Sequence, residues 1–124
     1  MTTITFPFLP AKETSPNARG HWRKRYAAVH KLREDTFMVA MSQQAPAFTE
    51  KVLISITYVV ATKRHRDGDN WLAMAKGMID GLVDAKVLVD DSSEYVSFAP
   101  VQFVVDKAKA PQTIIKIAVL KGEL

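Results

Sequence analysis

Residues 51–61, KVLISITYVVA, are rich in β-branched and aromatic side chains, from Val52 through Tyr58 to Val60. Such side chains favour the pleated, half-buried surface of a β-sheet. This run is the most strongly indicated strand of the chain. It is followed at once by the charged segment RHRDGDNW, residues 64–71. A predicted strand is therefore followed by a cluster of cationic and acidic residues, and the other predicted elements lie before and after these two segments.

Before this strand, residues 3–8 alternate polar and apolar and predict a first strand ended by Pro7 and Pro10. Residues 11–20, AKETSPNARG, are turn formers and predict a loop. An imperfect apolar stripe predicts a helix over residues 22–41. Pro46 interrupts the polar loop that leads on to residue 51. The first half of the chain is thus expected to run strand, helix, strand.

After this strand, Asp69 and Asn70 are good N-cap residues for a second helix that ends near Ala85. Its expected buried face consists of Leu72, Ala75, Ile79, Leu82 and Val83. The segment VLVDDS, from Val87, is a short strand or an extended turn. Residues 95–105 and 113–120 are expected to be the last two strands, and residues 106–112 are long enough for a hairpin loop between them.

The predicted order is β-α-β-α-β-β, which places the chain in the α/β (α+β) class: one small domain over residues 1–124, with a mixed β-sheet and two main helices. The 124 residues include no cysteine, which excludes disulfides and thiolate metal sites. No apolar run approaches the roughly 20 residues of a membrane span, and the N-terminal residues lack the features of a signal peptide. We expect a cytoplasmic protein with no membrane partner.

The net charge of +4 is unevenly distributed. Basic residues concentrate before the second helix, whereas carboxylates concentrate between Asp67 and Glu94. Basic arms around an acidic centre suit a polyanion held over a metal, although solvated surface patches are the commoner meaning of such charge runs. The residues expected to grip nucleic-acid phosphates are Arg19, Arg23, Lys24, Arg25, Lys63, Arg64 and Arg66.

The sequence Asp67-Gly68-Asp69-Asn70 places two carboxylates one residue apart. They converge if the chain turns between them, and glycine accepts such a turn. Oxygen ligands suit Mg²⁺ or Mn²⁺. Asp90 and Asp91 lie after the second helix, and the returning chain is expected to bring one of them towards Asp67 and Asp69. The alternative is that Asp67 and Asp69 only cap a helix and favour its dipole.

Lys76 follows Asp69 by two helical turns, or about 10.5 Å along the axis, so the two residues share a face. Its ammonium would lie near a phosphate on the metal, with Asp80 orienting it four residues further on. The simpler alternative is a lysine that extends along apolar surface to reach water. No phosphate-binding P-loop is present, so no nucleotide cofactor is expected.

Together, RDGDN, Lys76-x-x-x-Asp80, DGLVDAKVLVDDS and the upstream SPNARGHWRKR resemble the RusA family of Holliday-junction resolvases. The resemblance implies a homodimer that resolves four-way DNA junctions by paired, symmetric nicks with Mg²⁺ at each site. It implies metal-binding aspartates at Asp67, Asp69 and Asp91, with Asp90 as a further ligand or an outer neighbour. It also implies an essential lysine at Lys76.

In the best-known member of that family the lysine follows the D-x-D-N motif by about one helical turn, a position that Ala73 occupies here. Lys76 comes three residues later, which changes its facing by about 60°. The Lys76-to-Asp80 spacing and the run from Asp80 to Asp91 are kept. The departure concerns the role of Lys76 more than the carboxylates.

The resulting prediction is an endodeoxyribonuclease, with Asp67, Asp69, Lys76 and Asp91 as catalytic residues, acting in DNA recombination and repair. Two alternatives stay open: a junction-binding protein without catalysis, and a nuclease for other branched DNA. Trp22 and Trp71 are expected in the core or at a dimer interface, with stacking on an unpaired base as the less favoured role.

Overall fold

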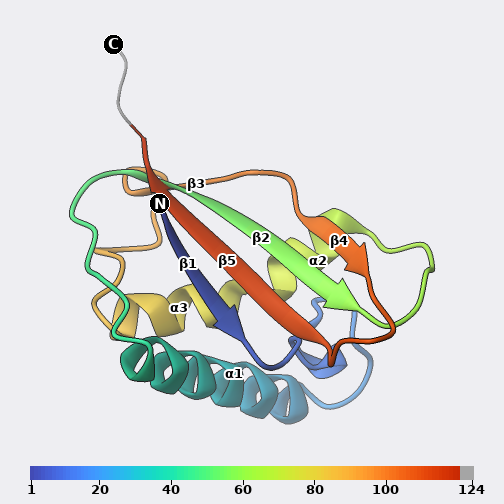
Figure 1. The fold of residues 1–124 in the computed structure, drawn as a ribbon. Coiled ribbons are helices and arrows are strands. Elements are labelled where there is room, and N and C mark those ends of the chain that lie inside the picture. Colours follow the sequence, from blue (N-terminus) through green and yellow to red (C-terminus); the bar gives the residue numbers. More distant parts are fainter. Residues whose placement is uncertain (121–124) are drawn as a thin grey trace.

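The computed structural model describes residues 1–120 and has a mixed five-stranded sheet with helices beside it (Figure 1). The elements in chain order are β1 (Thr2–Phe6), the short 3-10 helix η1 (Lys12–Thr14), α1 (Trp22–Ser42), β2 (Val52–Val60), α2 (Gly68–Met74), α3 (Lys76–Asp84), β3 (Val96–Phe98), β4 (Gln102–Val105) and β5 (Gln112–Val119). The predicted fold class, a small α+β domain with a mixed sheet, is confirmed. None of the helices in this part of the chain has the length and hydrophobicity that crossing a membrane requires.

Strand β2 is the centre of the sheet. One edge of β2 pairs antiparallel with β5, and β5 in turn pairs antiparallel with β1. The other edge pairs parallel with β3 near its start and with β4 near its end. The run of β-branched residues that indicated this strand is therefore hydrogen-bonded along both edges. Every second residue from Val52 to Val60 is buried, as expected for a central strand.

The expected hairpin between the last two strands is wrong. The loop after β4 does lead to β5, but the two strands lie on opposite sides of β2 and do not pair with each other. Loop length permitted a hairpin, whereas the buried, two-sided character of β2 requires a partner on each edge. The sheet meets that requirement by placing β4 and β5 on either side of β2.

The single strand expected over residues 95–105 is two strands. Pro100 separates β3 from β4, and proline has no N–H to donate to a neighbouring strand. The Ala99 N–H still donates to the Ile54 carbonyl at 3.0 Å, so the segment remains beside β2. The segment from Val87 forms an extended turn, one of its two predicted states, and buries Val87 and Leu88.

The core lies between one face of the sheet and helices α1 and α3, which run side by side in Figure 1. Ile4, Ile54 and Ile115 line the sheet face of this core. Leu32 of α1 and Leu82 of α3 close it from the helical side. Side chains alternate between the two faces of a strand, so Thr3 and Lys116, which are next to core residues in the sequence, lie on the other face of the sheet and are exposed.

Helix α3 approaches α1 closely because it presents glycine where the two cross. A Cβ on Gly81 would lie 2.6 Å from the Arg33 carbonyl oxygen and 2.8 Å from Thr36 Cβ, and one on Gly77 would lie 3.0 Å from the Val29 carbonyl oxygen. An ion pair fixes the far end of this contact, where Arg33 Nη2 donates to Asp84 Oδ1 at 2.8 Å. The Arg33 guanidinium holds the pKa of Asp84 below its usual value.

The second predicted helix is two helices that meet at Ala75. Ala75 is fully buried, with ψ near −2°, and its N–H donates to the Leu72 carbonyl at 3.1 Å, which tightens the last turn of α2. Met78 and Ile79 then donate to the Ala75 carbonyl as α3 begins. The helix also starts earlier than predicted, because its N-cap is Asp67. The break makes Lys76 the first residue of α3.

Candidate active site around Lys76

Asp67 caps the N-terminus of α2. Its backbone is extended, and its Oδ1 accepts from the Asp69 N–H at 3.0 Å. Asp69 lies in the first turn, where a carboxylate also favours the helix dipole. Both side chains are exposed. Capping, which was weighed as an alternative role for both residues, is confirmed for Asp67, and both carboxylates remain at the solvent side of the helix end.

Gly68 does not provide a special turn between these carboxylates. Its φ lies outside the left-handed region, and a Cβ at this position would meet nothing within 4 Å. Glycine was expected to make a turn easy here, but the chain turns by starting α2 at Gly68, with ordinary backbone angles. Asp67 and Asp69 are held near each other by the N-cap hydrogen bond of α2, and not by a special backbone conformation at Gly68.

The Lys76 ammonium joins two carboxylates that are far apart in the sequence. Its Nζ lies 2.8 Å from Asp80 Oδ1, one turn along α3, and 2.6 Å from Asp91 Oδ2, in the segment after α3. The hydrogen bonds that Lys76 donates to Asp80 and Asp91 raise the pKa of the lysine. The hydrogen bond from Lys76 lowers the pKa of Asp91 below its usual 3.8. The chain was expected to return after α3 and bring Asp90 or Asp91 towards Asp67 and Asp69. The contact it makes is between Asp91 and Lys76, and the carboxylates of residues 1–120 form no group of three around one point.

Asp90 shapes the segment that carries Asp91. Its Oδ1 accepts from the Asp91 N–H at 2.8 Å, while the side chain remains exposed. This local bond sets the direction of the backbone at Asp91. In this arrangement Asp90 supports the position of Asp91.

The predicted metal ligands offer the right chemistry without a preformed cage. Asp67, Asp69, Asp90 and Asp91 present only oxygen, which hard cations such as Mg²⁺ prefer. Within residues 1–120, however, no three Asp, Glu or His side chains are placed around one point to hold a metal ion. Asp91 is instead paired with Lys76. A divalent cation would therefore have to share Asp91 with the lysine or release it.

Asn70 ties this helix end to the loop before α1. Its Oδ1 accepts from Ser15 Oγ at 3.0 Å and from Asn17 Nδ2 at 3.2 Å. Its own Nδ2 lies 3.7 Å from the sulfur of Met74. The two motifs SPN and DGDN are thus joined directly in space. Sequence reasoning missed this role, because neither motif alone shows that the other is its partner.

Six of the seven predicted DNA-binding residues have exposed side chains: Arg19, Arg23, Lys24, Arg25, Lys63 and Arg64. The seventh, Arg66, is turned inward. Its Nη1 donates to the Thr62 carbonyl at 3.0 Å, and its guanidinium lies 5.9 Å from the centre of the Phe103 ring. Burial lowers the pKa of Arg66. Arg66 therefore holds the loop between β2 and α2 in place.

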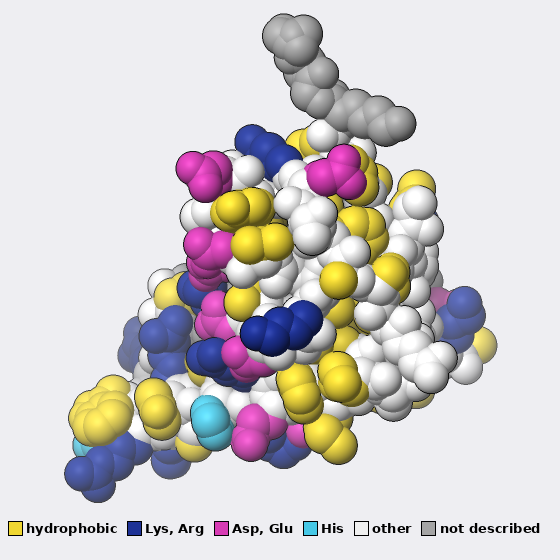
Figure 2. Space-filling model, turned by 90° about the vertical axis from the view of Figure 1, so that its left-hand side faces the viewer, with side chains coloured by type: hydrophobic (Ala, Val, Ile, Leu, Met, Phe, Trp, Pro, Cys, Tyr) yellow, Lys and Arg dark blue, Asp and Glu magenta, His cyan; other side chains and the backbone are white. Residues whose placement is uncertain are grey.

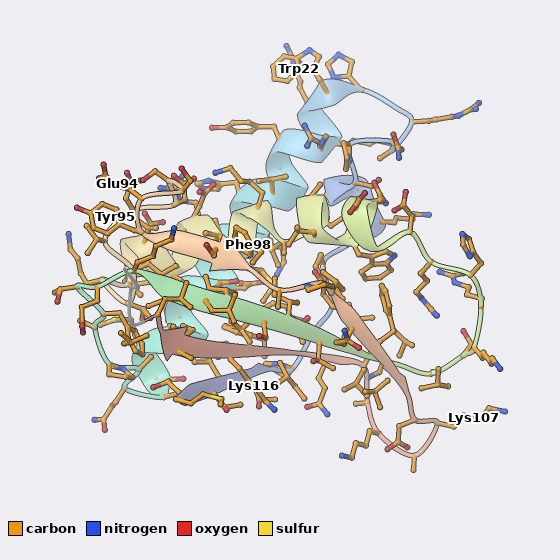
Figure 3. All side chains as sticks on the ribbon, turned by 90° about the horizontal axis from the view of Figure 1, so that it is seen from above. Trp22, Glu94, Tyr95, Phe98, Lys107 and Lys116 are labelled. Atoms are coloured by element: carbon orange, nitrogen blue, oxygen red, sulfur yellow. The ribbon has the colours of Figure 1, made fainter. Side chains whose placement is uncertain are left out.

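The two tryptophans have different environments. Trp71 is half-buried and packs 4.9 Å from the Tyr58 ring and 5.7 Å from the Phe103 ring, measured between centroids. The Tyr58 hydroxyl donates to the Trp71 carbonyl at 2.8 Å, which anchors α2 to the central strand. Trp22 is 67% exposed at the first residue of α1, and it projects from the end of that helix in Figure 3. Trp71 is a packing residue, as expected, and Trp22 is not in the core.

Cationic and acidic side chains adjoin on one face of the molecule. Figure 2 shows acidic groups next to Lys and Arg groups along its left side, with hydrophobic and basic groups together at the lower left. The Lys76 cluster and the basic start of α1 both contribute charge to the surface around α2. On such a surface a phosphate can bind to the cations while carboxylates lie nearby.

No family model matches the chain. An uncharacterized protein of Xylella fastidiosa (strain Temecula1) is 34% identical over 101 residues, which cover 78% of this chain and 64% of that protein. The chain therefore spans less than two thirds of the length of this relative, whose name assigns no activity. The function has to be argued from the residues around Lys76.

Proposed function

We propose that the chain is a Mg²⁺-dependent endodeoxyribonuclease that resolves four-way DNA junctions, in keeping with its resemblance to the RusA family. The observation that carries this proposal is the lysine held between two carboxylates. Lys76 contacts Asp80 and Asp91 at the start of α3, one short helix after the exposed carboxylates of Asp67 and Asp69. Lysine and aspartate gathered at a surface rich in arginine are the groups that phosphodiester hydrolysis uses.

Exposed cations on two loops support a DNA substrate. Arg19 lies in the loop before α1, and Arg25 lies in the first turns of α1. Lys63 and Arg64 lie in the loop before α2. Both loops reach the same helix, since Asn70 of α2 bonds to the first of them. Side chains of this kind contact backbone phosphates without reading the base sequence. They suit a substrate recognised by its shape.

Each residue of the cluster has a defined part in the proposed reaction. Lys76 stabilises the negative charge that develops on the phosphate oxygens, and Asp80 keeps the ammonium in place. Asp91 would hold the cation together with Asp67 and Asp69, and it would then share or give up its contact with Lys76. When bound by Asp67, Asp69 and Asp91, beside Asp90, Mg²⁺ or Mn²⁺ supplies Lewis-acid chemistry and an activated water.

A homodimer is part of this proposal. A four-way junction requires two strands to be cut, and residues 1–120 of one chain contain one such cluster of Lys76 with its carboxylates. A two-fold dimer brings two equivalent sites to the two strands. The partners proposed are therefore branched DNA and a second copy of the chain.

One observation favours a second candidate, a junction-binding protein without catalysis. Asp91 is paired with Lys76, and residues 1–120 contain no ready group of three metal ligands. If that pairing is permanent, the basic surface would still hold DNA while no hydrolysis occurs. A nuclease for other branched DNA is the remaining alternative, because preference among branched substrates depends on how a dimer is built.

Cleavage of a labelled four-way junction, beside a linear duplex with the same arms, tests these candidates. Reactions contain Mg²⁺, Mn²⁺ or EDTA, and use wild type, Asp69→Asn, Lys76→Met and the control Lys107→Met. Lys107 is an exposed lysine in the loop between β4 and β5, labelled at the opposite end of the molecule from Trp22 in Figure 3.

Paired nicks in the junction alone are expected for wild type and Lys107→Met, with loss in EDTA and in both site variants. Tight junction binding without nicks under either metal would reject the enzyme and leave the binding protein. Equal cutting of junction and duplex would keep the nuclease and reject junction specificity.

A further inference from the structure

A cavity of about 390 Å³ opens beside Lys76, between α1 and the junction of α2 with α3. Its volume is within the range of small-molecule sites. Trp22 and Tyr26 form one wall, and Ala73 and Gly77 form the opposite one. The remaining lining residues are Thr14, Arg25, Val29, Met74 and Lys76. The small residues on α2 and α3 leave the space that the aromatic residues on α1 border.

The charged residues that line this cavity are both cationic, although the Lys76 ammonium also contacts Asp80 and Asp91. Arg25 and Lys76 line it, and none of its lining residues is acidic. Next to it, the Arg23 guanidinium lies 5.5 Å from the centre of the Trp22 ring. Flat apolar walls with cations at the rim are complementary to a ligand that is aromatic and anionic at once. A nucleotide within a DNA strand has that chemistry.

The two aromatic side chains that line the cavity are largely exposed to solvent. Trp22 is 67% exposed and Tyr26 is 68% exposed. Trp71, by contrast, is packed against Tyr58 and Phe103. The Tyr26 ring stacks on His30 one turn further along, with the two planes only 2° apart. The first turns of α1 thus present flat rings to whatever approaches Lys76.

A smaller hollow of about 190 Å³ lies on the other side of Lys76. It is lined by Leu72, Ala73, Ile79, Asp91 and Phe98 as well as Lys76. Ala73 and Lys76 border both hollows. The cation that is proposed to contact the scissile phosphate therefore stands between two apolar surfaces, and the larger one carries the exposed aromatic rings.

We propose that the larger cavity receives one unstacked base of branched DNA next to the phosphate at Lys76. Trp22 and Tyr26 stack on the base, and Arg25 contacts the adjoining phosphate. This inference rests on the proposed function, and it adds the substrate feature that the site selects: a nucleotide free to leave its stack, as at a branch point. Linear duplex offers such a base only at the energetic cost of unstacking it.

A second copy of the chain is the competing occupant of this surface. In a two-fold contact each patch meets the same patch on the partner. Here that would bring Arg23, Lys24 and Arg25 of both copies together, with like charges opposed. The charge of the surface therefore favours DNA over the chain itself.

Junction binding in EDTA, followed by fluorescence anisotropy, separates binding from cleavage. The variants are Trp22→Ala, Tyr26→Ala and Trp22→Phe, with Met38→Ala as control. Met38 is 65% exposed on the same helix and does not line the cavity. We expect each alanine variant at the cavity to bind about 5- to 150-fold more weakly, Trp22→Phe to keep most of the affinity, and Met38→Ala to match wild type.

A junction with abasic sites at the branch point makes the test specific to the base. Wild type should bind the abasic junction more weakly than the intact junction, by about the factor expected for the alanine variants. Trp22→Ala should bind the two junctions with nearly equal affinity, because the missing base and the missing ring remove the same contact. Independent, additive losses would overturn the inference. So would unchanged binding by both alanine variants.

Sedimentation of the same proteins tests the competing occupant. If Trp22→Ala converts a dimer to a monomer at equal concentration, the surface is a protein interface and the inference is wrong. The proposed function fails in a different way: base-dependent binding would persist in EDTA while wild type makes no nicks in Mg²⁺. Normal nicking by Trp22→Ala with unaltered junction affinity would instead keep the nuclease and discard the base site.

Discussion

The Lys76 ammonium lies 2.6 Å from Asp91 Oδ2, across fifteen residues that include all of α3. This contact fixes where the chain returns after the helix. It also lowers the pKa of Asp91, because a carboxylate beside a cation ionises more readily. The relationship can be measured without any substrate.

Replacing Lys76 with methionine should raise the pKa of Asp91 towards its ordinary value of 3.8, because the largest cause of the lowered pKa is the hydrogen bond from Lys76. The contact is present above that value and is lost as pH falls through the lowered pKa of the folded protein. Carboxyl NMR titration of both proteins measures the change. Lys31→Met, which removes an exposed pair with Asp35, is the control and should leave Asp91 unaltered. An unchanged Asp91 titration in Lys76→Met would contradict the contact.

Much of the fold follows from local patterns, and the strand pairing does not. Val52 to Val60 had the composition of a buried strand, and Trp22 had the position of a helix start. The partners of β2 depended on which edges had to be covered, and no local pattern contains that information. Pro100 was the one visible signal that residues 95–105 could not be a single strand.

One contact of the candidate site was predictable from the sequence, and its long-range contacts were not. The spacing on a helix indicated Lys76 with Asp80, and the structure has that bond at 2.8 Å. The bond from Ser15 to Asn70 spans 55 residues and depends on where η1 packs. Arg66 was assigned to DNA by its charge, but an arginine can equally satisfy carbonyls such as that of Thr62.

Substitution of Asn70 by alanine should loosen the loop before α1, because Ser15 and Asn17 both donate to its side-chain oxygen. Limited digestion with trypsin, scored at Arg19, should run about five- to tenfold faster than in wild type. Asn70→Asp keeps an acceptor oxygen and should restore slow cleavage. Equal rates for all three proteins would show that the bonds do not hold the loop.

Tyr58→Phe should lower the free energy of unfolding by about 0.5 to 1.5 kcal/mol, since it removes the bond from the buried hydroxyl to the Trp71 carbonyl. Burial also raises the pKa of this hydroxyl. Urea denaturation measures the loss, with the half-buried Tyr95→Phe as the matched control. A loss of the same size in both variants would mean that the bond to α2 has no particular role.

Gly81 and Gly68 should respond oppositely to alanine. At Gly81 the added methyl group would lie 2.6 Å from the Arg33 carbonyl oxygen, so α1 must shift, and we expect a loss of about 1 to 3 kcal/mol. At Gly68 nothing lies within 4 Å, and alanine should stabilise by about 0.4 to 1 kcal/mol through the unfolded chain. Thermal and urea unfolding of the two variants give the signs directly. Stabilisation by Gly81→Ala would refute the close packing of the helices.

The placement of β5 between β1 and β2 has a consequence for how the protein is made. β1 pairs only with β5 in the sheet of residues 1–120, so the first of these five strands to be translated cannot pair until the last of them is made. Until then its hydrogen-bonding edge and the long edge of β2 are both open to other chains. Most sheet contacts therefore form after nearly all of these residues have been translated, which makes folding slow relative to synthesis. A nascent chain halted before residue 112 should be protease-sensitive throughout, and release of β5 should produce protection in one step.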